Sequence, residues 1–114
     1  MTITRDQMLS QARAACPDWM CDEDEDNLYL ALRDFGWHIW NQILVTDHKK
    51  LKPAFAVFER WLLEGDKDVQ LACQVGVFEA LKHVKHGKGP DYHEARRAFG
   101  SLLGPVAKKE WDAA

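Results

Sequence analysis

Residues 66–86 carry more apolar surface than a lone helix can leave in water. Asp66 can accept hydrogen bonds from the free N–H groups of a first helical turn, and Gly87 supplies a stop. At about 3.6 residues per turn, one continuous apolar face contains Val69, Ala72, Cys73, Gly76, Val77, Ala80 and Val84. A second apolar line, almost opposite, consists of Leu71, Val75 and Phe78. We therefore expect a helix that is covered on both sides, either within a helical domain or by a partner.

A helical hairpin is predicted where this segment begins. Pro53 suits the first turn of a helix over residues 53–64, and Gly65 ends that helix directly before Asp66. Because no linker separates the two helices, they should pack as an antiparallel pair. Further helices are predicted over residues 4–15, 26–45 and 91–103, followed by a short C-terminal turn. The predicted fold is therefore all-α, a compact bundle of about five helices around this hairpin, in one domain over residues 1–114.

Charge and cysteine content restrict the class of protein. The chain has 114 residues and a formal net charge of -3, so only a segregated basic face would favour nucleic acid. Basic residues near 82–97 are interpreted as a solvated end that balances the acidic N-terminal half. The N-terminus lacks the features of a secretory signal, no run is long enough to span a bilayer, and the three cysteines form no CxxC pair. We expect a cytoplasmic protein that binds neither nucleic acid nor membrane.

Five consecutive acids stand out in the N-terminal half. They are Asp22, Glu23, Asp24, Glu25 and Asp26. Acids at a helix start interact favourably with the helix dipole, which explains part of the run as a solvated helix entrance. The alternative is an electrostatic lure for a basic partner.

The helix predicted over residues 26–45 is also apolar on two sides. Its core stripe consists of Leu28, Leu32, Phe35, Gly36, Ile39 and Ile43. On the opposite side, Leu30, Trp37 and Leu44 repeat every seven positions, with Tyr29 and Trp40 beside them. Either other helices cover this side or it is an aromatic docking surface. We take Trp37 and Trp40, together with the five acids, as the candidate partner-binding residues.

Catalytic and metal sites have less support. His83, His86 and His93 could gather around a metal, but their spacing matches no established signature, and His86 also suits a helix C-terminus. Neither serine occupies a nucleophile-elbow motif, and Cys16 or Cys21 would need a distant histidine to act as a nucleophile. We expect no cofactor and no enzymatic activity, with a small metal-dependent enzyme as an alternative.

Several blocks of sequence carry a resemblance to known proteins. Residues 62–72 resemble the inter-helix turn of a HEAT-type repeat, although only one such unit is visible. Residues 28–36, 58–62, 68–70 and 77–81 resemble the ordered blocks of an uncharacterised bacterial family of short helical proteins. Some members of such families resemble immunity proteins of contact-dependent or secreted toxins, and no catalytic residue is carried over from them.

These patterns together predict a noncatalytic protein-binding function. The most concrete form is an immunity-type protein that binds and neutralises a cognate basic toxin. The alternative from a different class is a homo-oligomeric structural module, for example a homodimer. Its interface would use the line that contains Leu71 and Val75 or the line that contains Leu30 and Leu44.

Overall fold

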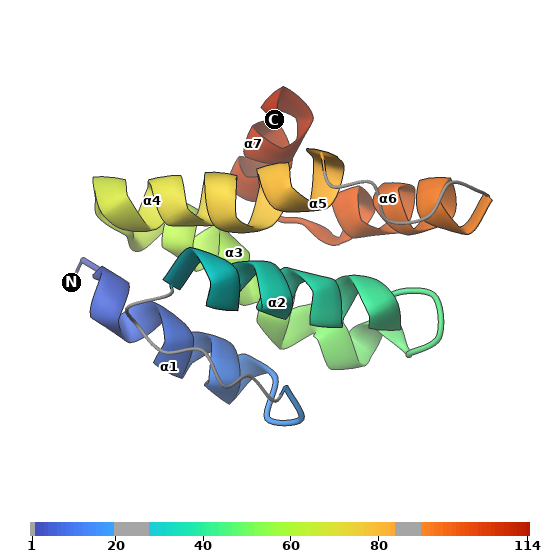
Figure 1. The fold of residues 1–114 in the computed structure, drawn as a ribbon, viewed down its shortest axis with the longest axis horizontal. Coiled ribbons are helices and arrows are strands. Elements are labelled where there is room, and N and C mark those ends of the chain that lie inside the picture. Colours follow the sequence, from blue (N-terminus) through green and yellow to red (C-terminus); the bar gives the residue numbers. More distant parts are fainter. Residues whose placement is uncertain (1, 20–27, 84–89) are drawn as a thin grey trace.

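Six helices make up most of the computed structural model, which describes residues 2–19, 28–83 and 90–114 (Figure 1). Five of them are α1 (Arg5–Ala15), α2 (Leu28–Gln42), α3 (Lys52–Glu64), α6 (Pro90–Leu102) and α7 (Pro105–Ala113). The other is continuous through α4 (Lys67–Cys73), the π-helical segment η3 (Gln74–Glu79) and α5 (Ala80–His83). A short 3₁₀ helix, η2 (His48–Leu51), leads into α3. The prediction of an all-α fold is confirmed.

The junction between α3 and α4 is held in place by hydrogen bonds from both of its sides. The Asp66 side chain accepts a hydrogen bond from the Val69 amide at 2.9 Å, so the predicted N-cap is present. On the other side, Ile3 donates its amide to the Glu64 carbonyl at 2.9 Å and accepts from the Asp66 amide at 3.1 Å. This parallel bridge between Ile3 and Gly65 is the single β pairing within the described ranges. The N-terminal segment is thereby tied to the middle of the chain.

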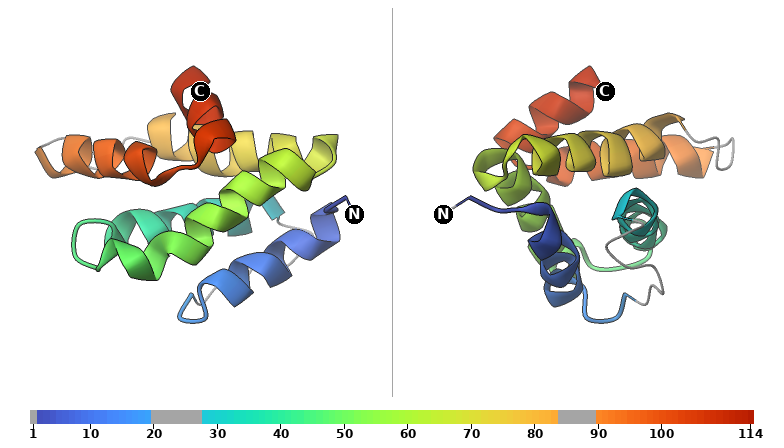
Figure 2. Two further views of the ribbon diagram at one scale, coloured as in Figure 1. Left: turned by 180° about the vertical axis from the view of Figure 1, so that it is seen from behind. Right: turned by 60° about the vertical axis from the view of Figure 1, so that its left-hand side comes forward.

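An aromatic cluster joins four elements at the centre of the molecule. The Phe58 ring, on α3, lies 5.8–5.9 Å from the rings of five other residues, measured between centroids. Those residues are Phe35, Phe55, Trp61, Phe78 and Phe99. Figure 2 shows α3 running between α1 on one side and the pair α6 and α7 on the other. These ring contacts therefore centre on α3.

The helix over α4, η3 and α5 does not keep a single α-helical register. Its predicted core face is buried, as shown by Val69, Cys73 and Val77, each fully inaccessible to solvent. The second predicted line is divided, because Leu71 and Val75 are exposed whereas Phe78 is fully buried. A π-helical turn, with i→i+5 hydrogen bonds, contains more residues than an α-helical turn. Residues that follow the start of the π segment therefore lie on a different face from the one that α-helical spacing predicts. This difference in register separates Phe78 from Leu71 and Val75.

The C-terminal residues differ from the short turn expected of them. Residues Pro105–Ala113 form a nine-residue helix, α7, with Gly104 at its N-cap and Pro105 in its first turn. Trp111 on α7 is buried, and its ring lies 4.8 Å from Phe99 and 5.7 Å from Phe78. This helix therefore completes the core instead of trailing from it.

The overall dimensions are those of a tightly packed helical protein. The Cα radius of gyration is 13.0 Å, close to the value of about 13 Å expected for a compact domain of roughly 100 residues. Among the helices that the structure describes, none has both the length and the apolar character needed to cross a bilayer.

Candidate partner-binding surface

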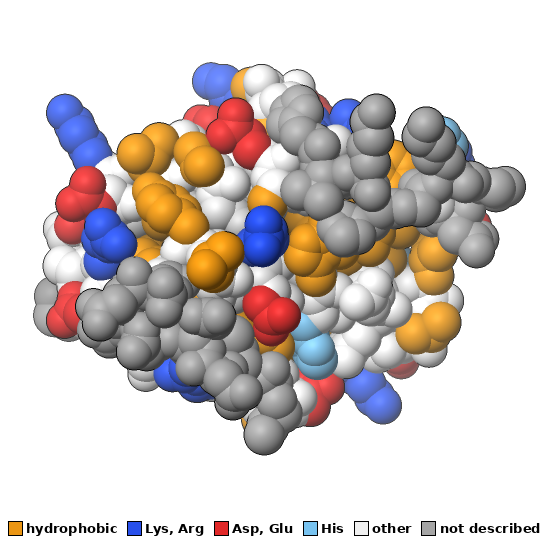
Figure 3. Space-filling model, viewed as in Figure 1, with side chains coloured by type: hydrophobic (Ala, Val, Ile, Leu, Met, Phe, Trp, Pro, Cys, Tyr) orange, Lys and Arg blue, Asp and Glu red, His pale blue; other side chains and the backbone are white. Residues whose placement is uncertain are grey.

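Four exposed apolar side chains gather where the start of α2 meets α4 and η3. They are Tyr29 (41% exposed), Leu30 (45%), Leu71 (50%) and Val75 (41%), and we call them the apolar surface. The Tyr29 ring packs over Gly76, since a Cβ on residue 76 would be 3.1 Å from its Cδ1. Val75 adjoins Gly76, and Leu71 lies one turn before Val75 on the same face. Figure 3 shows hydrophobic side chains gathered over α4 and the start of α2.

Gly76 is the reason that two helices can share this surface. α2 packs against η3, and Leu32 of α2 would also be 3.4 Å from a Cβ on residue 76. The missing side chain lets α2 approach η3 closely, which places Tyr29 over Gly76, the residue that follows Val75. The sequence pattern separates Tyr29 and Gly76 into two helices, so it gives no sign that they meet.

The five predicted acids lie outside the described residues. Their position in the chain is nevertheless informative, because Asp22 to Asp26 precede Tyr29 by seven to three residues. In the sequence, a strongly negative segment therefore comes shortly before the first residue of the apolar surface.

The two predicted tryptophans lie in an aromatic row that is largely covered. Trp40 is only 8% exposed, and its ring lies 5.7 Å from Tyr92 and 5.9 Å from Phe99. Trp37 is half-buried and makes an edge contact with Trp40 at 5.9 Å. Trp40 thus packs mainly against α6, which leaves little of it for contact with a partner. Leu30 and Leu44, the ends of the predicted seven-residue repeat, are exposed.

The predicted histidine group is described only in part. His93 is exposed on α6, whereas His86 and the side chain of His83 lie outside the described residues. Within the described ranges, no three His, Cys, Asp or Glu residues are arranged to hold a metal ion. The metal-dependent enzyme stays an alternative prediction.

The two described cysteines are buried, and burial suppresses their reactivity. Burial, with a smaller contribution from nearby Asp18, raises the pKa of the Cys16 thiol to about 11. Burial also raises the pKa of Cys73, and nearby Glu110 adds to the effect. Because the thiolate is the nucleophilic form, neither residue is activated at neutral pH. Cys21 lies outside the described residues.

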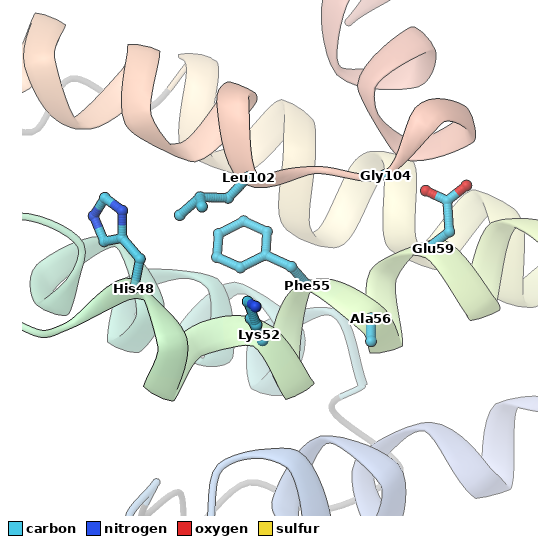
Figure 4. Close-up of a pocket in the computed structure, with 7 residues that line it drawn as sticks. All are labelled: His48, Lys52, Phe55, Ala56, Glu59, Leu102 and Gly104. Atoms are coloured by element: carbon cyan, nitrogen blue, oxygen red, sulfur yellow. The ribbon is translucent and has the colours of Figure 1, made fainter.

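A pocket of about 270 Å³ opens between α3 and the turn from α6 to α7 (Figure 4). Phe55 and Leu102 face one another across its middle, with His48 at one end and Glu59 at the other. Two of its three ionisable side chains, His48 and Glu59, already have structural partners. The Nε2 atom of His48 donates to the Ile43 carbonyl at 2.8 Å, and both Glu59 oxygens accept from backbone amides of α7. These bonds leave the pocket with mainly apolar walls and no paired nucleophile and base.

The chain belongs to the family described as "Domain of unknown function (DUF7674)", whose profile matches residues 6–114. This match confirms the predicted membership of an uncharacterised family. Comparisons with curated proteins and with solved structures gave no match.

Proposed function

We propose that this family member is a noncatalytic protein-binding protein, and most concretely a bacterial, cytoplasmic immunity-type protein that occludes a basic toxin. The observation that carries the proposal is the apolar surface, directly preceded in the chain by five acids. A partner with a basic rim around an apolar centre complements both features.

The apolar surface would supply the affinity. Tyr29 is an aromatic side chain with an apolar ring and a polar tip, the kind of residue that dominates interface energetics. Leu71 and Val75 provide an aliphatic platform beside it, and each still exposes two fifths or more of its surface to solvent. Burial of these side chains beneath a partner removes apolar area from water without unfolding any helix.

The acidic run would raise the rate of association with a basic partner and favour that partner over acidic proteins. Opposite charges near an interface accelerate diffusional encounter, and the acceleration falls as salt screens the charges. The same charges disfavour a second copy of this chain as the occupant. A second copy carries the same five acids and the same net charge of -3, and like charges repel.

The noncatalytic part of the proposal rests on the chemistry of the described residues. The thiols of Cys16 and Cys73 are buried with raised pKa values. Glu59 and His48, the titratable groups at the two ends of the pocket in Figure 4, are engaged in structural hydrogen bonds. Occlusion of a toxin requires no reacting group on this protein.

The experiment is capture of the tagged full chain from its own cells, followed by a wash at moderate salt and identification of the retained proteins. We expect a stoichiometric basic protein that stops growth when expressed alone and ceases to do so when this chain is co-expressed. Recovery of this chain alone, with a solution mass that doubles as its concentration rises, would contradict the proposal and identify a homo-oligomeric module.

A further inference from the structure

A second pocket, of about 440 Å³, opens where α6 and α7 meet the end of α5. The residues that give it its character are Lys82, Arg96, Arg97, Lys108, Trp111 and Asp112. It therefore contains four permanent cations and a single carboxylate, in a chain whose formal net charge is -3. This concentration of positive charge is opposite in sign to the whole protein.

Two of the cations, Arg96 and Arg97, form no ion pair within the described ranges. Asp112 is engaged with Lys108 at 4.0 Å, on the same helix. Both arginines are exposed and line this open, shallow site, where a solute can reach them.

Lys82 is held in a fixed position at the pocket wall. Its ammonium group donates to the backbone carbonyls of Trp111 and Ala114 and lies 4.8 Å from the centre of the Trp111 ring. These bonds satisfy free backbone carbonyls at the C-terminus of α7, so the position of Lys82 has a structural explanation. They do not explain the position of Arg96. Burial and the charge of Arg96 lower the pKa of Lys82, so these two cations repel one another across the site.

Gly100 shapes the floor of the pocket. A Cβ on residue 100 would be 2.9 Å from the indole Nε1 of Trp111, so only glycine allows the indole to lie directly against α6. Trp111 is therefore a buried wall of the pocket, in contact with Lys82 and Gly100. Its indole N–H is a spectroscopic reporter inside the site.

We propose that this pocket binds the phosphate group of a small phosphorylated molecule. The planar guanidinium groups of Arg96 and Arg97 match the oxygens of phosphate in a bidentate manner, and Lys82 adds a fixed point charge. A bound phosphate lies between cations that otherwise repel one another. A nucleic-acid chain fits less well, because it needs basic residues along an extended stripe. This site is independent of the apolar surface and of any protein partner.

The test uses the full chain labelled with ¹⁵N and titrated with inorganic pyrophosphate. The Trp111 indole N–H resonance is identified by its loss in Trp111→Phe. We expect it to shift and saturate with pyrophosphate, but not with sodium chloride at the same ionic strength. The variant R96Q/R97Q, on the exposed face of α6, should bind pyrophosphate at least tenfold more weakly, a loss of about 1.4 kcal/mol or more.

The matched control is K49Q/K50Q, which removes the same charge from two exposed residues of η2 that do not line the pocket. It should bind pyrophosphate as the wild type does. A shift that never saturates, or equal weakening in both double variants, would overturn the proposal and assign the effect to general electrostatics. Unchanged dispersion of the other indole resonances verifies that each variant is folded.

Discussion

Gly104 lies directly against the carboxylate of Glu59, so that a Cβ on residue 104 would overlap Oε2. The same carboxylate caps α7 from α3, because Oε1 accepts from the Val106 amide at 2.8 Å and Oε2 from the Ala107 amide at 3.2 Å. A negative group at this position also complements the dipole of α7. The C-terminal helix is therefore attached to the core through a side chain 47 positions earlier in the sequence.

The first prediction concerns this cap. Glu59→Ala should lower the free energy of unfolding by about 1–2 kcal/mol, because it leaves two amides of α7 without their acceptor. Gly104→Ala should cost a similar amount, since the new Cβ displaces the carboxylate. In the double variant the new Cβ has no carboxylate left to displace, so the two costs should not add. Urea unfolding of the four proteins measures this coupling, and strictly additive losses would show that Gly104 acts independently of Glu59.

The second prediction tests the change of register in η3. Phe78→Ala should cost about 3–5 kcal/mol, because Phe78 is fully buried against Phe58 and Trp111. Leu71→Ala should cost less than about 1 kcal/mol, because half of that side chain is already in water. A regular α-helix over residues 66–86 would place both residues on one line and give similar costs. Urea midpoints of the two variants decide between the registers.

The third prediction is a loss of stability in alkali. Burial raises the pKa of Cys16 from 9.0 to about 11, and burial also raises the pKa of Cys73. The unfolded thiols lose their protons above about pH 9 while the folded ones keep theirs, so unfolding becomes more favourable as pH rises. Each thiol should remove about 1.4 kcal/mol per pH unit between pH 9 and the folded pKa. This contribution is fully present below pH 9.

The control for this prediction is Cys16→Ala/Cys73→Ala, compared by slope because the small cavities lower its stability at every pH. Its free energy of unfolding should fall less steeply between pH 9 and 11 than that of the wild type. Equal slopes would mean that the thiols ionise as readily in the folded protein as in the unfolded chain.

The fourth prediction concerns the acidic run. Alanine at Asp22, Glu23, Asp24, Glu25 and Asp26 should lower the rate of association with the captured partner and flatten its dependence on salt. The dissociation rate should change less, because steering charges act mainly before contact. Stopped-flow mixing at several salt concentrations measures both rates. An association rate equal to that of the wild type would remove electrostatic steering from the proposed function.

Sequence periodicity was sufficient to predict the features that depend on the spacing of residues near one another in the chain. The Asp66 cap, and the buried face that includes Val69 and Val77, follow from residues within a few turns of one another. The π segment could not be predicted in this way, because its i→i+5 bonds leave no separate mark on the apolar pattern. Its effect was to bury Phe78 and leave Leu71 exposed.

Features that depend on distant partners were beyond local patterns. Trp40 has the spacing of a surface residue but is covered by Phe99, far along the chain. Glu59 of α3 caps α7, a helix that was itself not predicted, because only a short C-terminal turn was expected there. The meeting of Tyr29 with Gly76 depends likewise on the packing of α2 against η3. The apolar surface thus became visible only in the folded chain.

The most direct measurement is the affinity of the captured partner for two matched double variants, determined by titration calorimetry. Tyr29→Ser/Leu71→Ser alters the apolar surface, whereas Leu44→Ser/Val45→Ser alters two exposed apolar residues beyond the opposite end of α2. We predict that the first variant binds at least tenfold more weakly than the wild type, a loss of about 1.4 kcal/mol or more, and that the second binds as the wild type does. Full affinity in the first variant, or loss confined to the second, would contradict the assignment of this surface.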